Sequence, residues 1–352
     1  MSSKKPVVLF HKSCADGVTA AYSIYQKFGE NAHYIPMIHS EEKEEFFQQL
    51  IDEKVIDGNE IYVVDFYINQ NTVKFLKPHV SNITIIDHHM TAVVDYLKTF
   101  SPIMAKVLID NLPDDKKMID FFLASRYEFK HDEFTFIFDN THSGASLTYK
   151  HFNPKASFDN LPPHIKYVED VDLWKHKYED SKAFVLGLGS VSKSFDYKEH
   201  FKYFDNKEKT YEEKVDEIIS IGKEYVKIEK EIVEEKIKTA VEYEFFNKKL
   251  NKNDKVLVLF IDESLDKYKS ELGNKLAIKN AETNKALVIS VLPNGIVKCA
   301  GRSIGEANIN EVAEQFGGGG HKNASGFKFK NILEFNENFK KIKNIQTKKL
   351  TT

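Results

Sequence analysis

The residue types best suited to metal chemistry stand together at Asp87-His88-His89, directly after the apolar run Ile83–Ile86. A carboxylate and two imidazoles in consecutive positions suit hard or borderline divalent ions such as Mn²⁺, Mg²⁺ or Zn²⁺. The alternative interpretation is a polar strand end exposed to water. Further acids at the ends of other strands favour the metal interpretation.

Two more apolar runs end in residues of the same kind. His11 follows Val7–Phe10, and Asp65 follows Ile61–Val64. Asp16 lies five residues beyond His11, and Gly17 permits a tight turn into a helix. One carboxylate can bridge two ions, which makes Asp65 a candidate for a two-metal site. Taken singly, each of these acids is better explained as a helix cap or a surface residue.

A third acidic cluster holds Asp170 and Asp172, close to Trp174. A separate signal is the run of four glycines at 317–320, followed by His321, Lys322 and Asn323. Glycines do not fill a core, and their common use is close approach of the backbone to a ligand, especially a phosphate. A flexible linker is the alternative, but the run lies between an apolar helix and an apolar strand.

The elements that must position these residues alternate between strands and helices in the first half of the chain. This order predicts a doubly wound, mostly parallel sheet. Ligands of such sheets bind outside the carboxyl ends of the strands, where His11, Asp65 and Asp87 are expected. The spacing also predicts a helix over 17–28 that ends at Gly29, and mostly helical structure over 101–180.

We therefore predict a metal-binding domain at 1–200, a helical connector at 201–250 and a smaller α/β domain at 251–345. The connector rests on an amphipathic, charge-rich pattern over 207–246. In the last domain the pattern indicates a sequence of elements and a turn: strand Lys255–Phe260, helix Ser270–Asn280, strand Ala286–Leu292, turn Asn294-Gly295, strand Ile296–Ala300 and helix Ile309–Phe316.

Composition limits the functional classes. The 352 residues carry 50 basic and 53 acidic side chains, so no overall basic excess indicates a nucleic-acid coat protein. The two cysteines, Cys14 and Cys299, form no disulfide framework and fit a reducing compartment. Neither a signal peptide nor an apolar run of membrane length is evident. We expect a cytoplasmic protein without membrane contact, either a monomer or a homodimer.

Together these residues resemble the DHH phosphoesterase family with its DHH-associated C-terminal domain, which includes RecJ-type exonucleases, nanoRNases and cyclic-dinucleotide phosphodiesterases. The resemblance runs from His11 to Gly326. The matching segments, in family order, are His11 with Cys14-Ala15-Asp16-Gly17, Val64-Asp65, Asp87-His88-His89, Val168-Glu169-Asp170, Arg302-Ser303 and the glycine run ending in His321.

The resemblance implies two metal ions, Mn²⁺ in the first place, with Mg²⁺, Co²⁺ or Zn²⁺ as alternatives. One ion takes His11, Cys14 and Asp65, and the other takes Asp16, Asp65, His88 and Asp170. A hydroxide held between the ions attacks phosphorus, His89 assists at the phosphate, and Asp87 orients a neighbouring imidazole. The implied substrate contacts are Arg302, Ser303, Gly318, Gly319, Gly320, His321, Asn323 and His142.

One position departs from the family pattern. Many members carry an acid where this chain has Cys14, and a thiolate favours softer ions than Mn²⁺ or Mg²⁺. Cys14 then binds an ion closer to zinc, or the first ion is held weakly, or His11 compensates. A small buried thiol that only packs is the structural alternative.

The function that the resemblance implies is a divalent-metal-dependent phosphodiesterase or phosphohydrolase. Its substrates are expected to be short oligonucleotides, dinucleotides or nucleotide phosphates. A pyrophosphatase-like phosphoanhydride hydrolase is one alternative, because related enzymes share the metal motifs. A catalytically impaired nucleotide-binding protein is the other, with Cys14 as its sign.

Overall fold

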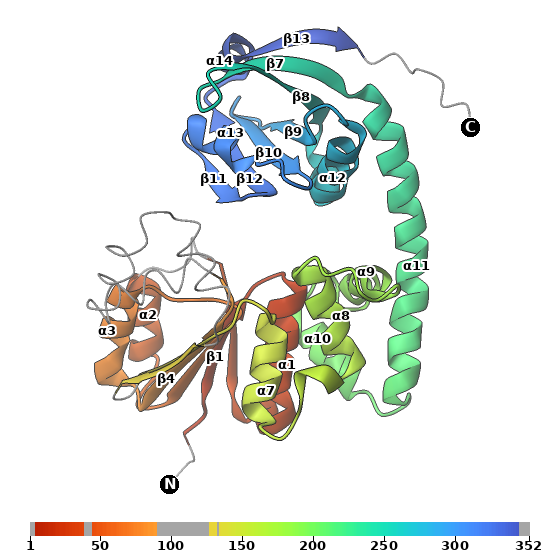
Figure 1. Cartoon of the computed structure of the whole chain (residues 1–352). Helices are drawn as coiled ribbons and strands as arrows, with labels where there is room; N and C mark the ends of the chain where they lie inside the picture. The colour runs from red at the N-terminus through yellow and green to blue at the C-terminus, as the bar shows by residue number, and fades with distance from the viewer. Residues whose placement is uncertain (1–3, 39–43, 90–126, 132–133, 345–352) are drawn as a thin grey trace. The chain divides into compact units, whose positions relative to one another are not determined.

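The computed structural model describes residues 4–38, 44–89, 127–131 and 134–344 (Figure 1). Residue contacts divide the chain into two units, Met1–Val226 and Lys227–Thr352, and each is described by itself. The boundary falls within helix α11, Tyr211–Lys236, which begins in the first unit and ends in the second. Within the stretch 101–180, predicted to be mostly helical, residues 101–126, 132 and 133 lie outside the described part, and residues 127–131 and 134–138 are strands and not helix.

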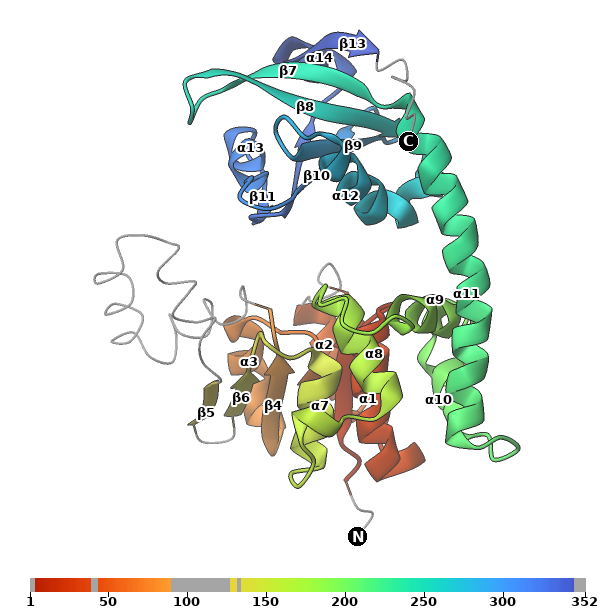
Figure 2. The ribbon, with the colours of Figure 1, turned by 45° about the vertical axis from the view of Figure 1, so that its right-hand side comes forward.

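The first unit is built on a six-stranded sheet with the order β2-β1-β3-β4-β6-β5. Five neighbouring strands are parallel. At one edge of the sheet β5 pairs antiparallel with β6, and Figure 2 shows β6 between β5 and β4. The predicted mostly parallel sheet is confirmed. The strands are β1 Val7–His11, β2 His33–Met37, β3 Glu60–Val64, β4 Asn82–Asp87, β5 Tyr127–His131 and β6 Phe134–Phe138.

Helices cover both faces of this sheet, which is why its central strands are almost entirely apolar. Helices α2 and α3 lie on one face, and α1 and α7 lie on the other (Figure 1). The predicted helix over 17–28 is α1, and Gly29 caps it as expected. The helices are α1 Ala15–Phe28, α2 Glu44–Asp52, α3 Gln70–Leu76, α7 Gly144–Phe152, α8 Pro163–Asp172, α9 Ser181–Val191 and α10 Tyr197–Asp205, with α11 last.

The register of the parallel strands decides which side chains meet at their carboxyl ends. Phe10 lies opposite Val64, and Val64 lies opposite Ile86. The next residues along the chain are His11, Asp65 and Asp87. These three residues therefore stand in a row at one edge of the sheet.

The second unit contains a seven-stranded mixed sheet with the order β11-β12-β10-β9-β8-β7-β13. Among the described strands of this second sheet, only β8 and β9 pair in parallel. The predicted turn at Asn294-Gly295 connects β9 with β10, and Gly295 has the positive φ of +84° that such turns require. The strands are β7 Val241–Asn247, β8 Lys252–Ile261, β9 Lys285–Val291, β10 Val297–Ser303, β11 Gly319–His321, β12 Ala324–Phe329 and β13 Phe339–Asn344.

Three helices accompany this sheet: α12 Lys269–Lys279, α13 Asn310–Gln315 and α14 Ile332–Asn338. Two details differ from the sequence prediction. Residues 241–247 are a strand of the second sheet and not part of a helical connector, because alternate residues of β7 are buried in the core. The end of the glycine run forms the edge strand β11. None of the helices in the described part of the chain has the length and apolar character of a membrane span.

Candidate metal centre

Asp65, the residue that directly follows β3, lies close to the other candidate ligands. Its φ is +48°, a left-handed conformation that non-glycine residues rarely adopt, and its backbone N–H donates to the Ile86 carbonyl at 3.0 Å. The sharp bend holds the carboxylate at the end of the strand, where it is 2% exposed. Strained backbone of this kind concentrates at functional sites.

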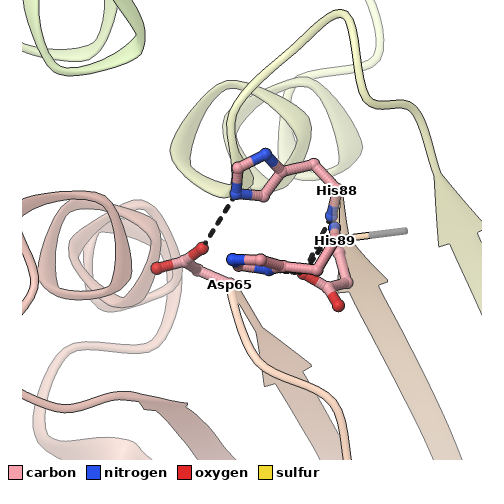
Figure 3. Close-up of side chains that lie close together, drawn as sticks. Asp65, His88 and His89 are labelled. Atoms are coloured by element: carbon pink, nitrogen blue, oxygen red, sulfur yellow. Dashed lines mark hydrogen bonds and ion pairs between the residues drawn. The ribbon is translucent and has the colours of Figure 1, made fainter. Parts of the chain in front are cut away.

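His88 joins this carboxylate from the adjacent strand. Its Nε2 lies 3.2 Å from Asp65 Oδ1, and Figure 3 shows the imidazole directed at the carboxylate. The same nitrogen lies 3.7 Å from Asp16 Oδ2 and 3.5 Å from Asp172 Oδ2. One imidazole nitrogen therefore faces three carboxylates that come from different segments of the chain.

The neighbouring carboxylates determine the direction in which the pKa of His88 shifts. Burial alone lowers the pKa of His88, but Asp65, Asp16 and Asp172 outweigh burial and raise it to about 10. Burial and the neighbouring acids raise the pKa of Asp16 and of Asp172. Burial also opposes ionisation of Asp65, but His11 and His88 hold its pKa below the ordinary value. The carboxylates thus stabilise positive charge at this point, whether a proton or a metal ion supplies it.

Asp16 is fixed by the beginning of helix α7. The backbone N–H groups of Gly144 and Ala145 donate to its two oxygens at 2.6 and 3.0 Å, and the Ser143 side chain caps the helix. A Cβ on Gly144 would lie 2.5 Å from Asp65 Cβ and 2.9 Å from Asp16 Oδ2. Only glycine lets the helix end approach both acids this closely.

His11 and Cys14 form a second group of donor atoms with Asp65. Nδ1 of His11 lies 3.7 Å from Asp65 Oδ2, and donor atoms of His11, Cys14 and Asp65 all lie within 4.8 Å of one another. Cys14 stands at the N-cap of α1, where its side chain makes no capping hydrogen bond. Burial, Asp65 and Asp16 raise the pKa of the Cys14 thiol well above its ordinary value, so that the sulfur stays protonated until a cation arrives.

Asp87 pairs with His89. Its Oδ1 lies 2.7 Å from Nδ1 of His89 and accepts the backbone N–H of His88 at 2.8 Å. Asp87 is fully buried, whereas the His89 side chain is 47% exposed. Burial lowers the pKa of His89, but Asp87 outweighs this and raises it. This geometry agrees with a carboxylate that orients an exposed, protonated imidazole.

One predicted ligand, Asp170, does not lie with the others. Both oxygens of Asp170 are engaged away from His88: they accept the backbone N–H groups of Lys177 and Tyr178 at 2.8 and 3.3 Å and the Ser181 hydroxyl at 2.5 Å. Asp172 takes the place beside His88 and Asp16. Two positions along helix α8 correspond to a rotation of about 200° about the helix axis, so the side chains of Asp170 and Asp172 point in nearly opposite directions and only one can face the centre.

Sequence reasoning also missed a role for Glu169. Its carboxylate lies 3.1 Å from His142 Nδ1 and 2.6 Å from Lys175 Nζ, and it accepts the Ser143 N–H at 3.3 Å. The ring of His142 stacks on Phe158 with centroids 3.6 Å apart. His142, predicted to contact substrate, is therefore held in an internal pair that fixes the loop before α7. The signal was present, because Glu169 belongs to the quoted Val168-Glu169-Asp170 motif.

The predicted substrate contacts of the second unit have varied surroundings. Ser303 is 2% exposed, and its hydroxyl forms hydrogen bonds with Ala307, Ile309, Lys322 and Asn323, which favours a structural role for this residue. The Arg302 guanidinium donates to the Gly301 carbonyl at 2.8 Å and to the Ser270 hydroxyl at 2.7 Å.

The glycine run shows close packing at two places. A Cβ on Gly318 would lie 2.1 Å from the Gly326 carbonyl, and one on Gly320 would lie 2.6 Å from the Ala324 carbonyl. Gly319 has nothing within 4 Å of such an atom. The side chain of His321 is outside the described part of the structure, so its predicted contact with substrate stays a prediction, as does that of Asn323.

The donor set fits divalent cations. Oδ2 of Asp65 and Oδ2 of Asp172 are buried and accept no hydrogen bond from the described residues. Buried carboxylate oxygens that accept no hydrogen bond are costly unless a nearby cation balances their charge. Carboxylates with imidazoles suit Mn²⁺, Mg²⁺ or Zn²⁺, and the Cys14 sulfur shifts the preference of its side toward softer ions.

Comparisons with known proteins agree with the two units. Residues 253–348 match the DHHA1 domain family. Protein R106 of Acanthamoeba polyphaga mimivirus, described as uncharacterized, is 24% identical over 93% of this chain and 68% of its own length.

Solved structures with a similar fold include the DHH domain of PF0399, described as a member of the S1p family of ribosomal proteins. It has a TM-score of 0.56 and 14% identity over 93% of this chain and 83% of that one. RecJ of Thermus thermophilus, crystallised with Mn²⁺, has a TM-score of 0.46 and 13% identity over 94% of this chain. This chain spans half of that RecJ chain. Residues 253–348 thus match the DHHA1 domain, and the fold of the chain is similar to that of a DHH domain.

Proposed function

We propose that this protein is a divalent-metal-dependent phosphoric ester hydrolase that acts on short nucleotide substrates. The observation that carries the proposal is the meeting of Asp16, Asp65, His88 and Asp172 around one point, with His11 and Cys14 on the other side of Asp65. The DHHA1 match and the DHH-like fold support the reaction class. The short nucleotide substrate rests on the sequence resemblance.

The side chains divide into two ligand groups that share Asp65. His11, Cys14 and Asp65 would hold one cation, and Asp16, Asp65, His88 and Asp172 would hold the other. Bound divalent cations would supply Lewis-acid activation of water and of the phosphate ester. Helix α7 keeps Asp16 in place through two N–H donors, so that the acid does not move when cations bind.

His89 is the residue proposed to act on the substrate directly. Asp87 holds its Nδ1, which leaves Nε2 to donate a hydrogen bond to a phosphate oxygen or a proton to the leaving oxygen. The raised pKa of His89 favours the protonated form that this step needs. In the second unit, Arg302, Asn323 and the glycine run remain proposed substrate contacts, on the basis of the sequence resemblance alone.

The test is hydrolysis by the full chain with Mn²⁺ and a panel of phosphate compounds. The panel comprises a dinucleotide, a pentanucleotide, 3′-phosphoadenosine 5′-phosphate, a cyclic dinucleotide, pyrophosphate and long single-stranded DNA. We expect cleavage of a short nucleotide that EDTA stops. Asp65→Asn should lower kcat at least about a hundredfold, because Asp65 belongs to both ligand groups. Asp57→Asn, at an exposed acid, serves as the matched control.

The other outcomes separate the alternatives. Cleavage of pyrophosphate alone would favour a phosphoanhydride hydrolase. No cleavage with Mn²⁺, Zn²⁺ or Co²⁺ would favour a nucleotide-binding protein without catalysis. Normal turnover by Asp65→Asn would rule out the proposed centre.

A further inference from the structure

Trp174 is the single tryptophan of the chain, and 48% of its surface is exposed. It stands two residues beyond Asp172, which faces His88 in the metal centre. Two residues of chain span at most about 7 Å, so the indole is attached close to the point where a phosphate would bind. Among the described residues, the other aromatic side chains of similar exposure are Tyr225, Phe246 and Phe260, which lie on α11 or in the second unit.

Hydrogen bonds to the buried Asp170 hold the loop that carries this tryptophan. Asp170 is 1% exposed and accepts the backbone N–H groups of Lys177 and Tyr178, beyond the loop. The Lys175 N–H donates to the Asp170 carbonyl at 2.9 Å. Trp174 and His176 have φ of +52° and +49°, values that persist only where the surroundings impose them. A buried carboxylate thus holds an exposed aromatic ring in a fixed turn.

A second connection ties the loop to the metal centre. Lys175 Nζ donates to Glu169 Oε1 at 2.6 Å and to the Thr141 carbonyl at 2.9 Å. Glu169 also accepts the Ser143 N–H at the start of α7, the helix whose next N–H groups hold Asp16. The loop and the acid of the centre are therefore positioned by the same helix end.

The loop also has the charge that a nucleotide requires. Lys175 is already paired with Glu169, but His176 and Lys177 also follow Trp174, and both are exposed as Trp174 is. An aromatic face beside basic side chains is the common means of binding single-stranded nucleotides, since every base has a π-face that can stack.

We propose that Trp174 is a nucleobase platform, stacking on the base whose phosphate lies at the cluster of Asp16, Asp65, His88 and Asp172. The inference rests on the proposed function and deepens it: the site selects nucleotides over phosphate esters that lack a base. Because stacking tolerates every base, the platform recognises the presence of a base and not its identity.

The direct test uses the tryptophan fluorescence of the full chain, which comes from Trp174 because the chain has a single tryptophan. The protein is titrated in Mg²⁺ with 5′-AMP, 3′-AMP and ribose 5-phosphate. We expect saturable quenching by at least one of the two nucleotides and none by ribose 5-phosphate. Equal responses to all three ligands, or no response to either nucleotide, would overturn the platform.

A kinetic test follows with Trp174→Ala and Trp174→Phe. For a dinucleotide, the alanine variant should raise KM about tenfold with little change in kcat, and phenylalanine should restore most of the loss. When each base of this dinucleotide is replaced by an abasic residue, the KM of the alanine variant should equal that of the unchanged protein. Tyr225→Ala, at a half-exposed aromatic residue of α11, is the control. An equal rise in KM for both substrates would contradict base stacking.

The two proposals fail in different ways. If the panel shows no hydrolysis but 5′-AMP or 3′-AMP quenches the fluorescence and ribose 5-phosphate does not, base recognition stands and the hydrolase fails. If hydrolysis occurs without base-dependent quenching, the hydrolase stands and the platform fails.

Discussion

At the scale of single residues, Asp170 and Asp172 separate structure from chemistry. Asp170 accepts three hydrogen bonds inside the protein, whereas Asp172 Oδ2 faces His88 without a hydrogen-bond donor among the described residues. We predict that Asp172→Asn lowers Mn²⁺ affinity at least about tenfold and leaves thermal stability nearly unchanged. Isothermal titration calorimetry with Mn²⁺ and a melting curve measure the two quantities.

Asp170→Asn is the matched comparison. It should lower the free energy of unfolding by about 1–3 kcal/mol, because a charged acceptor of two backbone N–H groups is lost from a buried position. Its Mn²⁺ affinity should fall less than that of Asp172→Asn. The reverse order of affinities would return the ligand role to Asp170.

Two further buried residues give the protein a dependence on pH. His164 and His200 are 3% and 0% exposed, and burial lowers the pKa of each to about 3. Since the folded pKa lies below the unfolded value near 6.5, their stabilising effect is complete above pH 6.5. It is lost as the pH falls toward 3, by up to about 1.4 kcal/mol per pH unit for each histidine.

We therefore predict that the urea midpoint of the first unit falls between pH 7.5 and pH 5. His200→Leu should reduce this fall, because neither ring nitrogen of His200 has a hydrogen-bond partner among the described residues. His176→Gln, at an exposed histidine, should leave the fall unchanged. A pH dependence that is the same in all three proteins would contradict the assignment.

At the scale of elements, the end of helix α7 determines whether the centre forms. Its first N–H groups hold Asp16, and Gly144 is the point of contact with Asp65. We predict that Gly144→Ala lowers Mn²⁺ affinity at least about tenfold, because the added methyl group pushes the helix end away from both acids. Calorimetric titration with Mn²⁺ measures this effect.

Gly326→Ala is the control for this substitution. Its Cβ would lie 3.5 Å from the Cys299 carbonyl, an ordinary contact, and it belongs to the second unit. Mn²⁺ affinity should match that of the unchanged protein. If Gly144→Ala binds Mn²⁺ equally well, the close approach of α7 is not required.

At the scale of the whole molecule, the described candidate ligand groups all belong to the first unit. We predict that Mn²⁺ raises the melting temperature of that unit and leaves the transition of the second unit in place. At about a hundred times the dissociation constant, the gain is roughly 2.7 kcal/mol. Differential scanning calorimetry with and without Mn²⁺ resolves the two transitions.

The variant Asp172→Asn provides the control, since it should lose most of the shift in the first transition. A shift of both transitions together would mean that the units unfold as one body. A shift confined to the second transition would place the metal outside the proposed centre.

The sequence by itself determined the central strands β1, β3 and β4 of the first sheet and the chemistry at their ends. Apolar runs that end in His11, Asp65 and Asp87 predict parallel strands, and parallel strands bring their carboxyl ends to one edge. The turn at Asn294-Gly295 and the cap at Gly29 are equally local, because each depends on a glycine conformation and its immediate neighbours.

The tertiary structure alone decided which polar side chains face the centre. Asp170 and Asp172 lie two residues apart on α8, and only the packing of that helix turns Asp172 toward His88. In the same way, Ser303 and His142 are engaged by residues distant in sequence. Spacing along the chain gives the residues available to a site, but the rotation of a helix or the burial of a hydroxyl depends on packing from the whole unit.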